Sequence, residues 1–312
     1  MERLSKIGGI LGCVLGLFVW MNPVAGHSLF DPWPVSLNPT SGGSTVYESL
    51  QLYSEIMGRD VSFSVYLPPG YEGSTLNFPV LYLLHGYSDD DTGWVQFGQV
   101  QRTADRAIRR WNAAEMIIVM PDAGVTWYVN TTESSEAYED FITKELIPHI
   151  DREFRTRSDR QYRAVAGLSM GGYGALMLGL RHPDLFSSSG VLSAGVMTDE
   201  EIMAMETGQW NRMLGLPFGM DLEGEARLTG HYNQYSPQTM IEQYKEKDHK
   251  CRFYIDCGDD DFLILGNMKL HEQMIKAGIP HEFRVRDGGH SWSYWRSALP
   301  KVLSFVSEVF HR

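Results

Sequence analysis

The sequence predicts an α/β fold, in which a mostly parallel central sheet has helices on both faces and an antiparallel hairpin at its N-terminal end. Two continuous apolar runs, residues 79–84 and 116–120, have the composition of strands that are buried on both faces. Such runs alternate along the chain with longer segments of helical periodicity, which is the pattern of parallel sheets. With 43% hydrophobic and 21% charged residues among 312, the composition excludes a disordered or fibrous chain.

The predicted elements follow one another in a regular order. Residues 44–67 alternate apolar and polar side chains about a turn at Gly58, Arg59 and Asp60, which predicts the hairpin. Further strands are expected at residues 79–84, 116–120, 162–168, 186–193, 251–257 and 281–286. Helices are expected at residues 101–112, 136–154, 171–180, 263–277 and 292–310. Residues 196–250 break this alternation, so we interpret them as an insertion within one domain that spans residues 27–312.

The first 26 residues have the features of a secretory signal peptide. Two basic residues precede an apolar run over residues 7–20, and small residues follow it, which predicts cleavage near Gly26/His27. The apolar run is shorter than the roughly 20 residues that a membrane-spanning helix needs. An uncleaved anchor and a lipoprotein signal at Cys13 are the less favoured alternatives. We therefore expect a secreted or periplasmic protein with no stable membrane insertion after cleavage.

The charge and aromatic content narrow the class of ligand. The chain has 27 Lys and Arg against 39 Asp and Glu, for a formal net charge of −12. An acidic surface repels phosphate backbones, so we expect no nucleic-acid partner. Aromatic residues make up 12% of the chain, which suits a cleft lined with rings. A neutral small-molecule or polysaccharide ligand fits this composition better than an anionic one.

The strongest local signal is the run GLSMGG over residues 167–172. It lies where an expected strand turns directly into an expected helix, which is the context of a nucleophile elbow. There the turn is too sharp for large side chains, and it lifts the hydroxyl of Ser169 above the sheet edge. The alternative is an ordinary serine that caps the helix in a tight turn.

A nucleophilic serine needs a base, and the base needs an orienting acid. In hydrolases with a nucleophile elbow, the chain order is typically nucleophile, acid and then histidine. This order places the acid near the end of the strand at 251–257 and the base at His290. The other histidines lie inside helices, at a helix end or at a strand start. Spacing alone leaves open whether the acid is Asp259, Asp260 or Asp261, which follow that strand in succession.

Two main-chain N–H groups are needed to stabilise a tetrahedral oxyanion. One is expected from Met170, next to the nucleophile, and the other from Tyr87, in the loop after the strand at 79–84. Gly86 allows the backbone of this loop to turn toward the site. His85 is therefore expected to have a structural role.

Aromatic residues near the same strand ends are candidates for the substrate pocket. Trp127 and Tyr128 follow the strand at 116–120 and are expected to wall an acyl or alcohol pocket. Trp210 and Phe218 belong to an apolar set in the insertion that could cover an acyl group. The alternative for Trp127 and Tyr128 is ordinary packing. For Trp210 and Phe218 it is that they bury the insertion's own helix against the body of the protein.

The acidic runs Asp89–Asp91 and Asp259–Asp261 could instead form weak calcium sites or solvated loops. We expect no metal and no cofactor, because a serine activated by His290 supplies the nucleophile.

Four motifs in this order resemble the putative-esterase family of α/β-hydrolases: PVLYLLHGYSDDDTGW, GLSMGGYGAL, CGDDDFL and GGHSWSYW. The family includes S-formylglutathione hydrolases, bacterial feruloyl and acetylxylan esterases, and mycolyltransferases. The resemblance covers residues 48–310. It implies an α/β-hydrolase fold, Asp261 as the acid, Tyr87 and Met170 as the oxyanion donors, and Trp94 beside the site.

The resemblance and the export signal together predict an exported serine carboxylesterase. It would hydrolyse acyl or feruloyl esters of plant polysaccharide through an acyl-enzyme. The alternatives are an acyltransferase to a sugar acceptor, a thioesterase similar to S-formylglutathione hydrolase, and a catalytically inactive carbohydrate-binding module. The intact set of Ser169, Asp261 and His290 argues against the last.

Overall fold

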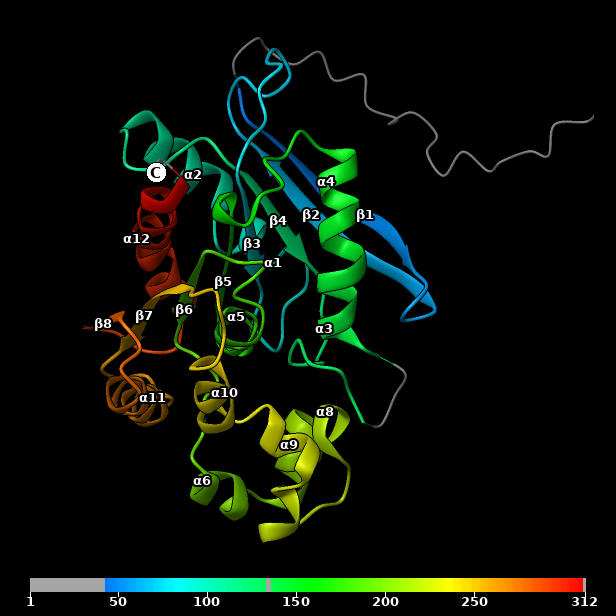
Figure 1. The fold of residues 1–312 in the computed structure, drawn as a ribbon, viewed down its shortest axis with the longest axis vertical. Helices are drawn as coiled ribbons and strands as arrows, with labels where there is room; N and C mark the ends of the chain where they lie inside the picture. The colour runs from blue at the N-terminus through cyan, green and yellow to red at the C-terminus, as the bar shows by residue number, and fades with distance from the viewer. Residues whose placement is uncertain (1–42, 133–135, 311–312) are drawn as a thin grey trace, which may run out of the picture. The chain divides into compact units, whose positions relative to one another are not determined.

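The computed structural model describes residues 43–132 and 136–310, so the predicted signal peptide lies outside the described residues. Within them, eight strands form one sheet in the order β1-β2-β4-β3-β5-β6-β7-β8 (Figure 1). The strands are β1 (Thr45–Ser54), β2 (Arg59–Leu67), β3 (Val80–Leu84), β4 (Ile117–Pro121), β5 (Arg163–Leu168), β6 (Ser188–Leu192), β7 (Arg252–Gly258) and β8 (His281–Arg286).

The strand directions confirm the predicted fold class. β2 pairs antiparallel with both β1 and β4, and every other neighbouring pair in the sheet is parallel. The hairpin turn differs slightly from the prediction, because it occupies residues 55–58. Gly58 takes the left-handed position of the turn, with φ of 66°, after which Arg59 already pairs with Ser54. The chain therefore re-enters the strand two residues earlier than expected.

Helices cover both faces of this sheet. The helices outside residues 196–250 are α1 (Gly93–Gln96), α2 (Val100–Arg109), α3 (Tyr138–Asp140), η1 (Phe141–Leu146), α4 (Ile147–Glu153), η2 (Arg160–Tyr162), α5 (Met170–Arg181), α11 (Ile264–Lys276) and α12 (Trp292–Phe310). Helices α2 and α12 pack together over one face, and α5 packs over the other (Figure 1). None of the described helices is long and apolar enough to cross a membrane.

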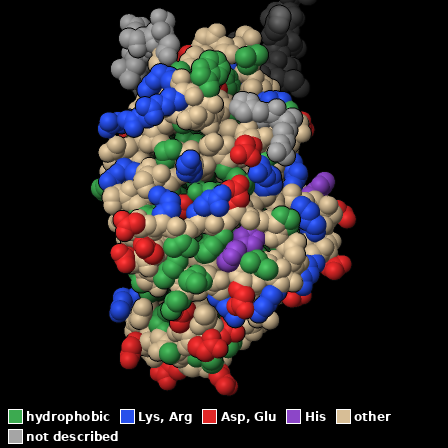
Figure 2. Space-filling view, turned by 90° about the vertical axis from the view of Figure 1, so that its left-hand side faces the viewer, with side chains coloured by type: hydrophobic (Ala, Val, Ile, Leu, Met, Phe, Trp, Pro, Cys, Tyr) green, Lys and Arg blue, Asp and Glu red, His purple; other side chains and the backbone are tan. Residues whose placement is uncertain are grey.

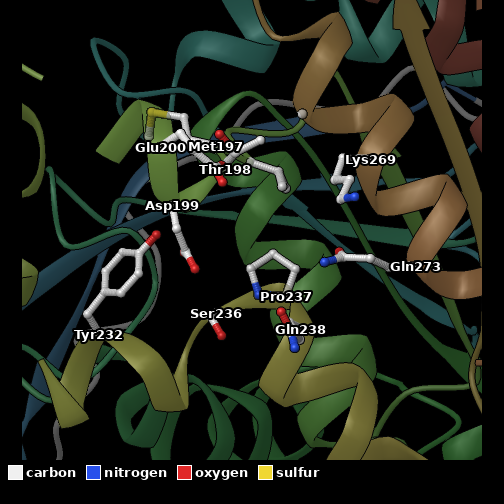
Figure 3. A pocket seen from close by; sticks show the side chains of 12 residues that line it. Met197, Thr198, Asp199, Glu200, Tyr232, Ser236, Pro237, Gln238, Lys269 and Gln273 are labelled. Atoms are coloured by element: carbon white, nitrogen blue, oxygen red, sulfur yellow. The ribbon is translucent and has the colours of Figure 1, made fainter. Parts of the chain in front are cut away.

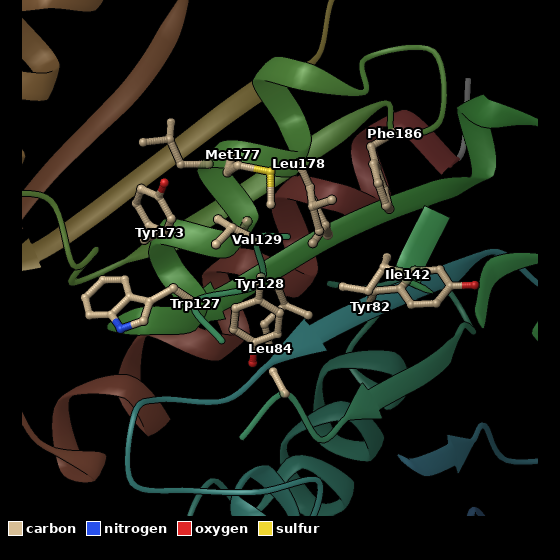
Figure 4. Close-up of a cluster of buried hydrophobic side chains, with 14 of the residues drawn as sticks. Tyr82, Leu84, Trp127, Tyr128, Val129, Ile142, Tyr173, Met177, Leu178 and Phe186 are labelled. Carbon is tan, nitrogen blue, oxygen red and sulfur yellow. The ribbon is translucent and has the colours of Figure 1, made fainter. Parts of the chain in front are cut away.

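The two faces of each central strand have separate hydrophobic cores, because successive side chains of a strand point to opposite sides. On β3, Leu81 and Leu83 pack beneath α2 and α12, whereas Tyr82 and Leu84 face α5. Figure 4 shows part of the hydrophobic core on the α5 side of the sheet, in which Leu178 of α5 lies over the strand. All four side chains on β3 are fully buried. This burial explains why the strand is a continuous apolar run in the sequence.

Residues 196–250, which we predicted as an insertion, lie between β6 and β7 and form short helices. These are α6 (Asp199–Ala204), α7 (Thr207–Trp210), η3 (Asn211–Gly215), α8 (Leu216–Phe218), η4 (Gly224–Arg227), α9 (Gly230–Gln234) and α10 (Pro237–Tyr244). α6 begins with a capping box, in which the Thr198 side chain accepts from Glu201 N–H and the Glu201 carboxylate accepts from Thr198 N–H. α10 packs on α5. The segment therefore leaves the sheet at the end of β6 and returns along α5.

Candidate active site

Ser169 lies in the sharp turn between β5 and α5. Its φ of 54° and ψ of −117° are a strained backbone conformation for a residue with a side chain. The turn is possible because glycines flank the serine: a Cβ on Gly167 would lie 2.2 Å from Gly171 O. A Cβ on Gly171 would lie 2.5 Å from His85 O. The strand–turn–helix geometry that we predicted for this motif is therefore present, and it presents the Ser169 hydroxyl beyond the end of β5.

The structure brings three of the predicted residues together. His290 Nε2 lies 3.0 Å from Ser169 Oγ, and His290 Nδ1 lies 2.9 and 3.0 Å from the two carboxylate oxygens of Asp261. Asp261 follows β7, and His290 lies in the loop between β8 and α12. A hydroxyl, an imidazole and a carboxylate in this chain of contacts form the arrangement of a serine nucleophile with its general base.

The Asp261 carboxylate is buried but remains suited to a negative charge. Its side chain is 2% exposed, and burial alone would raise its pKa. The contact with His290 and the hydrogen bond from Leu263 N–H outweigh burial and lower the pKa below its ordinary value. An ionised carboxylate beside Nδ1 keeps the proton of the neutral imidazole on Nδ1. Nε2 is then free to accept the proton of Ser169.

Two aromatic rings hold the imidazole of His290 in place. The ring of Phe262 lies 4.6 Å from it between centroids, and the ring of Trp295 meets it edge-on at 4.8 Å. Trp295 is itself fixed, because its indole N–H donates to Ser193 Oγ at 3.1 Å. The histidine therefore has little freedom to turn away from Ser169.

The neighbouring aspartates have other partners. Asp256 is fully buried within β7 and accepts hydrogen bonds from the hydroxyls of Tyr254 and Tyr294 and from Arg286. Asp259 and Asp260 are exposed. Among these four carboxylates, the one that reaches His290 is Asp261. Spacing left open which of three successive aspartates is the acid, and the geometry of the turn selects Asp261.

The carboxylates of the acidic runs Asp89–Asp91 and Asp259–Asp261 do not stay together, because Asp91 and Asp261 are buried with partners of their own. Asp91 is 4% exposed and accepts from Ser64 Oγ at 2.5 Å and from Ser49 N–H at 3.1 Å. Within the described part of the chain, the carboxylates close enough to share an ion are Asp259, Asp260 and Asp287, all of them exposed. Exposed acidic groups commonly lie together without an ion, and these three carry no argument for a metal.

The main-chain N–H groups of Tyr87 and Met170 flank the nucleophile. Neither N–H donates a hydrogen bond to any residue that the structure describes. Met170 is the first residue of α5, so its N–H has no partner within the helix. A Cβ on Gly86 would lie 3.7 Å from Ser169 Cβ, which places the loop that carries Tyr87 beside the serine. Both free donors are therefore available to a negative oxygen at Ser169.

His85 supports this loop, as we predicted for a structural residue. It is 1% exposed, and its Nε2 accepts the N–H of Ala123 at 2.9 Å. With Nε2 occupied as an acceptor, Nδ1 carries the proton and donates to Gly86 O at 2.7 Å. This contact fixes the peptide group between Gly86 and Tyr87, whose N–H is one of the two free donors.

A pocket of about 360 Å³ opens at Ser169. Its lining is mainly apolar and comes from four parts of the chain: Tyr87, Trp127, Gly195, Met197, Glu201, Ala204, Met205, Gln209, Met213, Phe262 and Leu263. Of the predicted substrate-binding residues, only Trp127 lines it. The sequence did not single out the lining residues Met197, Met205 or Phe262. A signal was present, because methionine recurs through residues 197–220 and this flexible side chain is frequent at adaptable binding surfaces.

Trp127 and Tyr128 are adjacent in sequence but have different surroundings. Both are left-handed, with φ of 56° and 63°, so the chain turns tightly between them. Trp127 faces the pocket, whereas Tyr128 is fully buried and donates its hydroxyl proton to His85 O at 3.0 Å. A Cβ on Gly174 would lie 2.6 Å from the Tyr128 ring, which shows how closely the ring packs on α5. The prediction that Tyr128 lines the substrate pocket is therefore corrected.

Three further predicted pocket residues are packing residues. Trp94 is fully buried, and its indole N–H donates to Leu84 O at 2.9 Å. Trp210 is fully buried and donates to Gly219 O at 2.7 Å. Phe218 is 4% exposed. The two tryptophans satisfy their one polar atom internally, and Phe218 packs against the ring of Tyr232, so these three residues stabilise the fold and do not line the pocket at Ser169.

Two side-chain hydrogen bonds join the pocket segment to the loops that flank Ser169. The hydroxyl of Tyr87 donates to Arg212 O, and the indole N–H of Trp127 donates to Met213 O at 2.7 Å. Both carbonyl groups belong to η3, a helix with wide, π-type turns. Such turns occur frequently at functional sites. The wall of the pocket and the loop with the free N–H of Tyr87 are thereby held in one arrangement.

Comparison with known proteins agrees with this geometry. A model of the putative esterase family matches residues 54–306. The solved structure of a ferulic acid esterase has a TM-score of 0.72 and 34% identity, over 86% of this chain and 99% of that chain. An acetyl esterase of Caldicellulosiruptor saccharolyticus is 25% identical over 267 residues, which are 83% of this chain and 97% of that protein.

A further relative is much longer than this chain. An endo-1,4-beta-xylanase/feruloyl esterase of Xylanibacter ruminicola is 36% identical over 163 residues, which are 50% of this chain and 22% of that protein. The family match covers most of the described residues and confirms the resemblance carried by the four motifs. The chain therefore belongs to the putative esterase family of α/β-hydrolases and is a serine hydrolase of the esterase type.

Proposed function

We propose that this esterase is exported and hydrolyses feruloyl and related bulky acyl esters of plant polysaccharide, with Ser169, His290 and Asp261 as its catalytic residues. The observation that carries the acyl preference is the apolar pocket of about 360 Å³ at Ser169. Its volume lies within the range of small-molecule sites, roughly 300–1,000 Å³. Trp127 and Phe262 offer rings to an aromatic acyl group, and Met205 offers an adaptable apolar surface. The feruloyl and acetyl esterases among the relatives support the same choice.

In the first half of the proposed reaction, Ser169 Oγ attacks the carbonyl carbon of the ester while His290 Nε2 accepts the hydroxyl proton. Asp261 stabilises the imidazolium that forms. The carbonyl oxygen becomes negative, and the N–H groups of Tyr87 and Met170 donate to it. The bond to the alcohol then breaks, and His290 gives its proton to the leaving alkoxide oxygen. The products are the free alcohol and an acyl group bound to Ser169.

In the second half, water replaces the alcohol. His290 accepts a proton from the water as its oxygen attacks the acyl carbon, and the same two N–H groups stabilise the second oxyanion. When the bond to Ser169 Oγ breaks, His290 returns the proton to that oxygen. The carboxylic acid is released and the serine is restored. A sugar hydroxyl in place of water would give acyl transfer, so product analysis separates hydrolysis from transfer.

The test is a substrate panel of methyl ferulate, methyl acetate, p-nitrophenyl acetate, acetylated xylan and S-formylglutathione. We expect kcat/KM for methyl ferulate to exceed that for methyl acetate by at least about tenfold, because an apolar pocket discriminates by about 1–3 kcal/mol for each added apolar group. Ferulic acid should also be released from arabinoxylan. Efficient deacetylation of xylan without action on methyl ferulate would contradict the acyl assignment. A preference for S-formylglutathione would favour the thioesterase alternative.

Replacing Met205 with alanine should reduce kcat/KM for methyl ferulate more than for p-nitrophenyl acetate. The methionine lines the pocket, so truncation removes apolar contact from a bulky acyl group and leaves a small one unaffected. We expect a selective loss of about 5- to 50-fold on the bulky ester, with an unchanged melting temperature.

The matched control for this variant is Trp210→Ala. Because Trp210 is fully buried away from the pocket, its truncation should lower stability by about 3–5 kcal/mol and reduce both activities together. The opposite result, a selective loss for Trp210→Ala and a uniform one for Met205→Ala, would show that the two roles have been interchanged.

Tyr87→Phe should lower kcat for methyl ferulate by up to about fivefold with little change in KM. The variant keeps the N–H at position 87 but removes the hydroxyl that donates to Arg212 O, a hydrogen bond of about 1 kcal/mol. If this bond positions the oxyanion donor, the loss appears in kcat. A changed KM at constant kcat would instead assign the hydroxyl to substrate binding.

A further inference from the structure

A second cavity, of about 340 Å³, lies between the start of α6, the start of α10 and the side of α11 (Figure 3). Ser169 does not line it. Met197 lines both this cavity and the pocket at Ser169, so the two adjoin at this residue. The volume is again within the range of small-molecule sites, roughly 300–1,000 Å³. The lining is mainly polar, in contrast to the pocket at Ser169.

Tyr232 supplies the most informative group in this cavity. Its side chain is only 8% exposed, and its hydroxyl makes no hydrogen bond with any residue that the structure describes. The ring is fixed edge-on against Phe218, with 5.2 Å between centroids. Figure 3 shows the hydroxyl pointing into the cavity, toward Asp199. The ring is therefore buried while the hydroxyl is accessible from the cavity, where it can donate to and accept from a bound ligand.

Three other side chains around the cavity also lack hydrogen-bond partners among the described residues: Asp199, Gln238 and Gln273. A carboxylate accepts hydrogen bonds, whereas an amide both donates and accepts. Together with the Tyr232 hydroxyl, they offer both donors and acceptors to one space. A ligand with several hydroxyl groups, each able to donate and to accept, satisfies such a lining.

The charge of the lining disfavours an anion. Asp199 and Glu200 are both acidic, and the positive charge of Lys269 is already paired with Glu272 at 3.0 Å. Figure 2 shows acidic side chains gathered at the lower end of the molecule, where Figure 1 places α6 and α9. Pro237 adds an apolar surface on one side of the cavity. Phosphorylated or carboxylated ligands are repelled there, whereas the C–H face of a neutral sugar ring can pack against the proline.

We propose that this cavity binds a neutral glycosyl unit, held by the Tyr232 hydroxyl and by the side chains of Asp199 and Gln273. The proposal goes beyond the proposed function, because it concerns a cavity without Ser169 and holds whatever acyl group the esterase removes. A polysaccharide chain bound here would lie across Met197 from the nucleophile. The cavity would then retain the glycan while successive esters reach Ser169.

The test is calorimetric titration of the protein with xylotetraose, an oligosaccharide without ester groups. We expect saturable binding that Tyr232→Phe and Gln273→Ala each weaken by about fivefold, the equivalent of one neutral hydrogen bond. Tyr232→Phe keeps the ring against Phe218, so its melting temperature should match that of the unaltered protein. Tyr53→Phe is the matched control, since it removes an exposed hydroxyl on β1, and it should bind as the unaltered protein does.

Absence of saturable binding by the unaltered protein up to about 10 mM xylotetraose would overturn the proposal. Equal affinity in Tyr232→Phe and the unaltered protein would overturn it too, as would binding of spermidine in place of the sugar. Hydrolysis of methyl ferulate by Tyr232→Phe should stay within about twofold of the unaltered rate. If the unaltered protein hydrolyses methyl ferulate but does not bind xylotetraose, the result contradicts this cavity alone. If it binds xylotetraose but does not hydrolyse methyl ferulate, the result contradicts the proposed function alone.

Discussion

Replacing Ser169 with alanine is expected to lower kcat/KM for methyl ferulate by about 10⁴- to 10⁶-fold, while the chain still folds. The hydroxyl that lies 3.0 Å from His290 Nε2 is the only part of the side chain that the substitution removes. Without it no acyl-enzyme forms, and the free N–H groups of Tyr87 and Met170 act on an ester that has no nucleophile. The measurement is steady-state hydrolysis, with circular dichroism to verify the fold.

Ser293→Ala is the matched control for that experiment. Ser293 is an exposed serine three residues from His290, and its hydroxyl contacts that of Ser291 at 2.9 Å. Its removal should leave the rate within about threefold, as for surface substitutions that cost under 0.5 kcal/mol. More than a tenth of the unaltered activity in Ser169→Ala would remove this residue from the mechanism. A fluorophosphonate, from which the serine oxygen displaces fluoride to form a phosphonyl-serine, should label the unaltered protein and fail to label Ser169→Ala.

The parts of the site that could be predicted from sequence are those set by local backbone geometry. The turn at Ser169 requires glycines at short spacing, because a Cβ at Gly167 or Gly171 would meet backbone atoms at 2.2 and 2.5 Å. That requirement leaves a pattern in the sequence. The parallel strands also follow from local composition, since β3 to β6 are buried along their full length.

The pocket could not be predicted in the same way, because its lining depends on how side chains pack after the chain has folded. Trp210 was predicted to line the pocket but is fully buried, with its indole N–H bonded to Gly219 O. Met205 was not predicted to line the pocket, and it does. Neighbouring residues differ for the same reason. The Tyr128 side chain lies in the core, whereas that of Trp127 lines the pocket. Both residues have a left-handed backbone conformation, which the conformational preferences of tryptophan and tyrosine do not predict.

The long helix predicted over residues 136–154 shows a similar limit. The structure divides it into α3, η1 and α4, with wide turns over Phe141–Leu146. Pro148 lies in the first turn of α4, and proline has no N–H to donate to the carbonyl four residues earlier. The wider turns before it accommodate the missing hydrogen bond. The periodicity of the apolar residues predicted the buried face correctly but not this local change of helix type.

Asp261→Asn is expected to lower kcat by about 10⁴-fold, with little effect on the fold. An asparagine has nearly the same shape but presents an amide N–H₂ or a neutral oxygen to His290 Nδ1, in place of an ionised carboxylate at 2.9 Å. The neutral imidazole then favours the tautomer with its proton on Nε2, which cannot accept the proton of Ser169. The imidazolium formed during the reaction also loses its counter-charge. The loss should therefore appear in kcat and not in KM.

Asp259→Asn and Asp260→Asn are the matched controls, because they make the same chemical change within two residues of Asp261. Asp259 is exposed and accepts from Gly288 N–H at 3.0 Å, and Asp260 is exposed as well, so each variant should keep kcat/KM within about threefold. Comparable losses for Asp260→Asn and Asp261→Asn would show that the wrong carboxylate has been assigned. Since the pKa of Asp261 is held below its ordinary value, its carboxylate is ionised at neutral pH, which is the form that Asp261→Asn removes.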